Sequence, residues 1–216
     1  MLYKAAIFDL DGTLLDTLDD LADAMNDALK TQGFATHPAE RYKRMVGNGV
    51  INLAKRALPA DRQEMLEPIL GLMRQNYAKN ALNKTKPYDG VLKTVLKLHE
   101  NGVKLAVLTN KDQTFSVRIV EHYFGKEMFD LIWGAIPGRP IKPDPAALYE
   151  LLTKLDVPPE KAVFVGDSGV DMDTAKAANV KSVGVTWGFR GRQELTEHHA
   201  GHIVDNPAEL LKVLHT

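Results

Sequence analysis

Two carboxylates, Asp9 and Asp11, stand where an apolar run ends in the segment KAAIFDLDGTLLDTLDD, residues 4–20. On an extended backbone, residues two apart point to the same side, so both carboxyl groups are expected to face one site. An Asp-Gly pair after a strand is also a common turn. The pair therefore indicates chemistry only if other polar residues converge on it.

Further polar residues follow two later apolar runs, at 105–108 and 162–165. They are Thr109, Asn110, Asp167 and Asp171, and Lys142 stands between the two groups. Each has an ordinary structural role when taken alone, as a turn, a helix-start acid or a surface lysine. Their occurrence at the ends of successive expected strands favours a functional site.

Such a site would combine four carboxylates, one ammonium and two small hydrogen-bonding side chains. Clustered acids repel one another unless a cation is present. Hard oxygen ligands without His or Cys select Mg²⁺, and the chain contains no cysteine. A lysine and hydroxyl donors beside Mg²⁺ suit phosphoryl transfer, in which an aspartate can itself be the nucleophile.

The apolar runs predict the scaffold of this site. Continuous apolar character is typical of strands buried on both faces of a parallel sheet. The expected strands are 5–8, 105–108, 131–133, 162–165 and 182–185. Helical patterns alternate with them, as at 91–99, and Asp144-Pro145 predicts a helix start with Asp144 as N-cap, running to about 153. We expect an α/β fold with a doubly wound parallel sheet, in which ligands bind at the carboxyl ends of the strands.

One long stretch departs from this alternation. Residues 15–87 contain helical patterns at about 18–33, 39–46, 49–58 and 61–80, and no convincing strand. A connection between a strand and a helix usually has two to six residues. We therefore expect an inserted α-helical cap domain at 15–87 and a core domain made of 1–14 and 88–216.

Composition limits the partners and the compartment. The 216 residues include 27 Lys and Arg against 28 Asp and Glu, so no charge excess predicts binding to nucleic acid or to an anionic membrane. No stretch approaches the roughly 18 apolar residues that cross a bilayer. A chain without cysteine and without an export signal is expected in the cytoplasm.

Taken in order, these motifs resemble the four motifs of the haloacid dehalogenase (HAD) superfamily phosphatases. They are DxDGT at 9–13, Thr109-Asn110, Lys142 in IKPDP, and GDSxxD at 166–171. The resemblance covers the whole chain. It implies a Rossmann-like HAD core, and the helical insertion after the first motif looks like a C1-type cap.

The resemblance also implies catalytic roles. Asp9 would attack phosphorus and form an aspartyl-phosphate, while Asp11 would act as general acid to the leaving alcohol and then as general base to water. Thr109 and Asn110 would donate hydrogen bonds to the phosphoryl oxygens. Lys142 would neutralise charge on the nucleophile and the phosphate.

The same resemblance implies the metal site. Mg²⁺ would be held by Asp9, by the backbone carbonyl of Asp11 and by Asp167. Asp171 would lie adjacent to the ion or in the layer of residues behind its ligands.

Within the superfamily, the closest similarity is to phosphoglycolate phosphatases, and it implies 2-phosphoglycolate as the substrate. The stretches DLDGTLLDT, VGNG, KPYDGV, LTNK, GRPIKPDP and VGDS carry this similarity. Substrate choice in capped members lies largely in the cap. The candidates for contact with a substrate carboxylate are Arg41, Lys43, Arg44 and Asn48, with Arg190 and Arg192 beside Gly191 as further candidates.

Several alternatives stay open on this scaffold. A sugar-phosphate phosphatase, a pyrophosphatase or a phosphomutase would use the same motifs, and either a monomer or a homodimer is compatible with the sequence. A hydrolytic dehalogenase is disfavoured because it needs neither a general acid at Asp11 nor a metal. A non-catalytic binding protein is disfavoured because Asp9, Asp11, Lys142 and Asp167 are all present.

Overall fold

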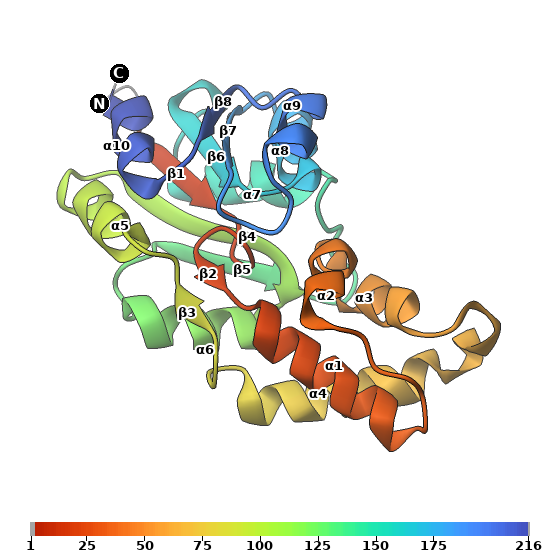
Figure 1. Ribbon diagram of the computed structural model, residues 1–216. Coiled ribbons are helices and arrows are strands. Elements are labelled where there is room, and N and C mark those ends of the chain that lie inside the picture. Colours follow the sequence, from red (N-terminus) through yellow and green to blue (C-terminus); the bar gives the residue numbers. More distant parts are fainter. Residues whose placement is uncertain (1–2, 216) are drawn as a thin grey trace.

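Six parallel strands form the central sheet of the protein in a computed structural model that describes residues 3–215 (Figure 1). The strand order is β5-β4-β1-β6-β7-β8. The strands are β1 (Ala5–Phe8), β4 (Lys104–Asp112), β5 (Leu131–Ala135), β6 (Ala162–Gly166), β7 (Lys181–Val185) and β8 (His202–Val204). Strand order reverses around β1, so the carboxyl ends of β4, β1 and β6 meet at the switch point where such sheets bind ligands. The expected doubly wound parallel sheet is confirmed.

Helices cover both faces of this sheet because successive strand residues point to opposite sides. Ile7 belongs to a buried cluster with Leu148, whereas its neighbour Phe8 belongs to a second cluster with Val95. The first face carries α7 (Ala146–Leu155) and α8 (Gly169–Ala177), and the second carries α5 (Val91–Glu100), α6 (Gln113–Phe124) and α10 (Pro207–His215). The short helices η2 (Pro159–Lys161) and α9 (Arg192–Glu197) complete this part.

The remaining helices lie together at one end of the sheet (Figure 1). They are α1 (Leu18–Thr31), α2 (Ala39–Met45), α3 (Gly49–Ala57), the 3₁₀ segment η1 (Ala60–Met65) and α4 (Leu66–Asn80). These positions match the expected helices, except that the stretch expected at 61–80 is divided. Arg62 has a non-helical backbone (φ −129°), and the regular helix begins only at Leu66.

The expectation of no strand between residues 15 and 87 is wrong. β2 (Leu15–Asp16) pairs antiparallel with β3 (Lys86–Pro87), where the chain leaves the sheet for the helices and returns. Two residues per strand are too few to show an alternating pattern, so no sequence pattern predicts these strands. We propose that this ribbon marks the boundary between the two domains at 15–87.

Two further differences concern the sheet and a helix start. Strand β8 was not expected, and β4 continues past Leu108 to Asp112, so that Thr109 and Asn110 lie within a strand. Helix α7 has Pro145 as its N-cap residue instead of Asp144. The Asp144 side chain nevertheless accepts a hydrogen bond from the Ala146 N–H at 2.8 Å, so it still satisfies a helix-start donor.

Among residues 3–215, no helix has the length and apolar character needed to cross a membrane.

Candidate active site

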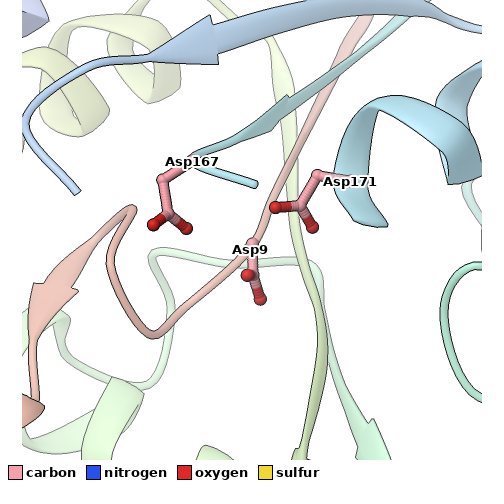
Figure 2. A group of neighbouring side chains, drawn as sticks. All are labelled: Asp9, Asp167 and Asp171. Carbon is pink, nitrogen blue, oxygen red and sulfur yellow. The ribbon is translucent and has the colours of Figure 1, made fainter. Parts of the chain in front are cut away.

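Three carboxylates meet at the switch point of the sheet. Asp9 follows β1, Asp167 follows β6, and Asp171 lies in the first turn of α8. Each offers an oxygen within 4.8 Å of the others, and Figure 2 shows the three carboxyl groups gathered at the strand ends. They meet because β1 and β6 are neighbours in the sheet.

Asp9 is held by one of its two oxygens. Oδ1 accepts hydrogen bonds from the Leu10 N–H at 2.7 Å and from Lys142 Nζ at 2.9 Å. Among the described residues, Oδ2 has no hydrogen-bonding partner. Burial raises the pKa of Asp9 to about 6, and Asp171 and Asp11 raise it too, against the opposing effect of Lys142. Asp9 therefore has one carboxylate oxygen, Oδ2, that accepts no hydrogen bond from residues 3–215, and its buried surroundings disfavour the charged form of the carboxyl group.

Asp167 is buried beneath the loop that follows β1. Its Oδ2 accepts a hydrogen bond from the Phe189 N–H at 2.7 Å. A Cβ atom on Gly12 would lie 2.5 Å from the same oxygen, and Gly12 has a φ of +86°, so only glycine fits there. Burial, followed by the charges of Asp171 and Asp9, raises the pKa of Asp167 well above its usual range.

Asp171 and Lys142 form a buried ion pair of 2.6 Å between Oδ1 and Nζ. The other carboxylate oxygen of Asp171 accepts hydrogen bonds from the N–H and Oγ of Ser168, which closes the capping box of α8. Both oxygens of Asp171 are thus occupied. Burial alone would lower the pKa of Lys142, but Asp171 and Asp9 outweigh it and raise the pKa, so the ammonium stays charged.

The donor set fits Mg²⁺. Clustered carboxylate oxygens are hard ligands of the kind that Mg²⁺ prefers, and one lysine faces three acids. Burial is the main cause of the raised pKa values of Asp9 and Asp167, and it is reinforced by the negative charge of the neighbouring acids. A divalent cation would balance it.

Asn110 holds the backbone on which Lys142 stands. Its Oδ1 accepts a hydrogen bond from the Lys142 N–H at 2.9 Å, and its Nδ2 donates to the Lys142 carbonyl at 2.9 Å and to the Gly47 carbonyl at 3.2 Å. The amide side chain is therefore engaged with backbone groups, including one from the α2–α3 loop. Thr109, which is also buried, lines the adjoining cavity.

That cavity lies between the strand ends and helices α1, α3 and α4, and has a volume of about 720 Å³ including the space open to solvent. Asp9 and Asp11 both line it. The expectation of an extended backbone between them is wrong, because β1 ends at Phe8 and the chain bends at Leu10. Asp11 lies outside the group of three carboxylates.

Asp11 has partners of its own. Lys111 Nζ donates to Oδ1 at 2.9 Å and to Oδ2 at 3.1 Å, and Thr17 Oγ1 donates to Oδ1 at 2.8 Å. Lys111 follows directly after Thr109-Asn110 in the stretch LTNK, and its place at a strand end is the signal that would have identified it. The two aspartates thus pair with different lysines, Asp9 with Lys142 and Asp11 with Lys111.

Helix α4 brings two further residues to the cavity that the sequence did not single out. Arg74 forms an ion pair with Asp112 at 3.0 Å, and Tyr77 lies against Lys111 and Phe115. No motif marks either residue, because Tyr77 occupies a buried helical position like any core aromatic. They reach the cavity because of where α4 lies relative to the sheet.

The four cap candidates, Arg41, Lys43, Arg44 and Asn48, do not appear among the described residues that line the cavity. Arg41 and Arg44 are exposed, and Lys43 pairs with Glu40 at 2.9 Å. Asn48 lies between two glycines of the cavity wall, but its Oδ1 accepts a hydrogen bond from Arg56 at 3.1 Å.

The two arginines near Gly191 take different places. Arg190 lines the cavity and donates a hydrogen bond to the Val46 carbonyl at 2.6 Å, so it joins the core to the α2–α3 loop. Arg192 forms an exposed ion pair with Asp205 at 2.7 Å and does not line the cavity.

Comparison with known proteins gives consistent results. Residues 6–185 match the family of haloacid dehalogenase-like hydrolases. Phosphoglycolate phosphatase 1 of Pseudomonas aeruginosa is 35% identical over 97% of this chain and 79% of its own length, and the phosphoglycolate phosphatase of Aquifex aeolicus is 31% identical over 98% of this chain and 96% of its own.

Solved structures also resemble this fold. CbbY of Rhodobacter sphaeroides, in complex with xylulose-(1,5)bisphosphate, superposes with a TM-score of 0.80 at 26% identity, with 96% of each chain covered. A crystal structure from Lactobacillus delbrueckii subsp. bulgaricus, assigned as a phosphoglycolate phosphatase, superposes with a TM-score of 0.93 at 33% identity, with 99% of each chain covered. The chain therefore belongs to the haloacid dehalogenase-like hydrolases, as a member similar to the phosphoglycolate phosphatases.

Proposed function

We propose that this phosphatase hydrolyses 2-phosphoglycolate with bound Mg²⁺ and through a phosphorylated Asp9. The observation that carries the proposal is the free Oδ2 of Asp9, beside Lys142 and the other carboxylates, at a cavity that Asp11 also lines. The two aspartates pair with different lysines, Asp9 with Lys142 and Asp11 with Lys111, so they can take different parts in the reaction. The similarity to phosphoglycolate phosphatases supports the choice of substrate.

In the first half-reaction, Asp9 Oδ2 bonds to phosphorus and the bond from phosphorus to the alcohol oxygen breaks. Asp11 gives its proton to that oxygen. In the second half-reaction, Asp11 takes a proton from water as the water oxygen bonds to phosphorus and the bond to Asp9 breaks. One group serves as acid and then as base, as microscopic reversibility requires.

Lys142 stabilises negative charge on Asp9 and on the phosphoryl oxygens, and Thr109 is close enough to the cavity to donate to them. Asn110 would act by fixing the Lys142 backbone. Asp9, Asp167 and the Asp11 carbonyl would hold Mg²⁺, with Asp171 behind them because its oxygens are occupied. When bound there, Mg²⁺ would supply positive charge to balance that of the transferred phosphoryl group.

The test is a comparison of kcat/KM for Mg²⁺-dependent phosphate release across small phosphate compounds, because specificity is defined by that ratio. The panel contains 2-phosphoglycolate, hexose phosphates, xylulose 1,5-bisphosphate and pyrophosphate. We expect 2-phosphoglycolate to rank first. A higher ratio for a sugar phosphate would exclude 2-phosphoglycolate as the preferred substrate, and no release from any of them would exclude a phosphatase.

A sugar-phosphate phosphatase is the second candidate, because the CbbY structure holds a sugar bisphosphate in the same fold. Pyrophosphatase and phosphomutase activities have no comparable support. A cytoplasmic location, a small phosphorylated metabolite as partner, and a monomer or homodimer stay predictions from the sequence.

A further inference from the structure

Tyr77 of α4 and Lys111 of β4 meet at the wall of the cavity. Lys111 Nζ lies 4.5 Å from the centroid of the Tyr77 ring, and the Phe115 ring packs edge-on against Tyr77 with centroids 5.2 Å apart. Both side chains are buried, with Tyr77 1% exposed and the Lys111 side chain 5% exposed. The ring and the ammonium are therefore held in fixed positions.

The Tyr77 hydroxyl has no hydrogen-bond partner among the described residues. Buried polar groups nearly always have one, so this orphan calls for an explanation. A lysine ammonium can only donate hydrogen bonds, so a bond from Lys111 to the Tyr77 oxygen would still leave the phenol proton without an acceptor. Burial raises the pKa of Tyr77 to about 12, so the phenol keeps its proton. A ligand oxygen that enters the cavity could accept the hydrogen bond that the Tyr77 hydroxyl lacks.

Lys111 brings a positive charge to the same wall. The two oxygens of Asp11 accept from its ammonium, which has three N–H groups, and Tyr77 lies beside the remaining one. The ion pair with Asp11 places this buried positive charge at the wall of the cavity. Arg74 is less available, since Asp112 already pairs with it.

We propose that Tyr77 and Lys111 form the subsite that binds the carboxylate of the substrate. The proposal rests on the proposed function, in which Asp11 protonates the leaving oxygen. One methylene separates that oxygen from the carboxylate of 2-phosphoglycolate, so a carboxylate oxygen lies within about 4 Å of it. Lys111, which contacts Asp11, is therefore in reach of the carboxylate, and Tyr77 adjoins Lys111.

The experiment measures binding without turnover. In the Asp9→Asn protein with Mg²⁺, titration calorimetry compares 2-phosphoglycolate with 2-hydroxyethyl phosphate, which replaces the carboxylate by a neutral group. Adding Tyr77→Phe is expected to weaken 2-phosphoglycolate binding roughly tenfold, as for one hydrogen bond to a charged group. Binding of 2-hydroxyethyl phosphate is expected to change less than about twofold.

The matched control is Tyr149→Phe, which removes a hydroxyl from an exposed tyrosine of α7. It should leave both affinities unchanged. Tyr77→Phe should melt no lower than its parent, because the lost hydroxyl has no partner. A second variant, Lys111→Met, should weaken 2-phosphoglycolate more than 2-hydroxyethyl phosphate.

The outcomes separate this inference from the proposed function. Equal effects of Tyr77→Phe on both ligands, or no effect, would overturn the subsite even if the otherwise unaltered enzyme hydrolyses 2-phosphoglycolate. Selective loss of carboxylate binding, with no turnover by the unaltered protein, would support the subsite and overturn the function. Selective loss in Lys43→Met without loss in Tyr77→Phe would also overturn the subsite.

Discussion

Replacing Lys142 by methionine removes the ammonium from the carboxylate cluster and keeps a side chain of similar length. Lys142 Nζ contacts Asp171 at 2.6 Å and Asp9 at 2.9 Å, and its side chain is 3% exposed. Water cannot take over these contacts at such a depth. The variant therefore leaves the buried acids without their cation.

Breaking a buried ion pair by removing one partner typically costs about 3–5 kcal/mol of unfolding free energy. The cost depends on pH because the acids can take up protons instead. The pKa of Asp9 is already raised to about 6, and Lys142 acts to lower it, so the pKa rises further in the variant. A folded-state pKa above the unfolded one means that stability falls as pH rises towards the folded value. We expect a larger loss at pH 8 than at pH 6.

Urea unfolding in EDTA at pH 6 and pH 8 measures this loss, with Lys154→Met on the exposed face of α7 as the control. Added Mg²⁺ should restore part of the stability of the Lys142→Met protein. A loss below about 1 kcal/mol at pH 8 would contradict the reasoning, since the buried-pair cost would then be absent. So would a larger loss at pH 6 than at pH 8.

Three further predictions concern the same site. Asp9→Asn should abolish phosphate release, and Asp11→Asn should lower kcat about 10²- to 10⁴-fold; substantial turnover in either would show that the role is misassigned. Mg²⁺ should raise the melting temperature of the unaltered protein and raise that of Asp167→Asn much less, as scanning calorimetry would reveal. Gly12→Ala should destabilise the fold and weaken Mg²⁺ binding, because its Cβ would lie 2.5 Å from Asp167 Oδ2, whereas Gly33→Ala has a similar φ of +75° and open space around it. Equal losses of unfolding free energy in these two alanine variants would mean that the close approach to Asp167 is not what requires glycine.

The sheet and the carboxylate cluster could be predicted because their signals are local. Each buried strand is a continuous apolar run, and parallel strands bring their carboxyl ends to one edge, so Asp9 and Asp167 had to lie close together. Strands of two or three residues such as β2, β3 and β8 carry no pattern of this kind. Their existence depends on pairing partners distant in the sequence.

The cap side of the site could not be predicted in the same way. The role of Arg41, Lys43 and Arg44 in binding an anionic substrate stays a prediction. A charged helix face is oriented by the apolar residues opposite it, and here Tyr42 and Met45 are buried while Arg41 and Arg44 are exposed. Tyr77, by contrast, was not a candidate and yet lines the cavity. A buried aromatic on a helix looks like core, and only the position of α4 over β4 brings it to Lys111.

The positions of the two lysines explain why the motifs determine the chemistry but not the substrate. Lys142 joins Asp9 to Asp171; Asp9 directly follows β1, Lys142 lies between β5 and α7, and Asp171 belongs to α8. Lys111 joins Asp11 to Tyr77, a residue of α4. Asp9, the proposed nucleophile, is therefore positioned by the core, while Asp11, the proposed acid, is linked through Lys111 to α4. A change on α4 would alter what surrounds the leaving group without disturbing the carboxylate cluster, and substrate choice can diverge on this scaffold while the DxDGT motif stays the same.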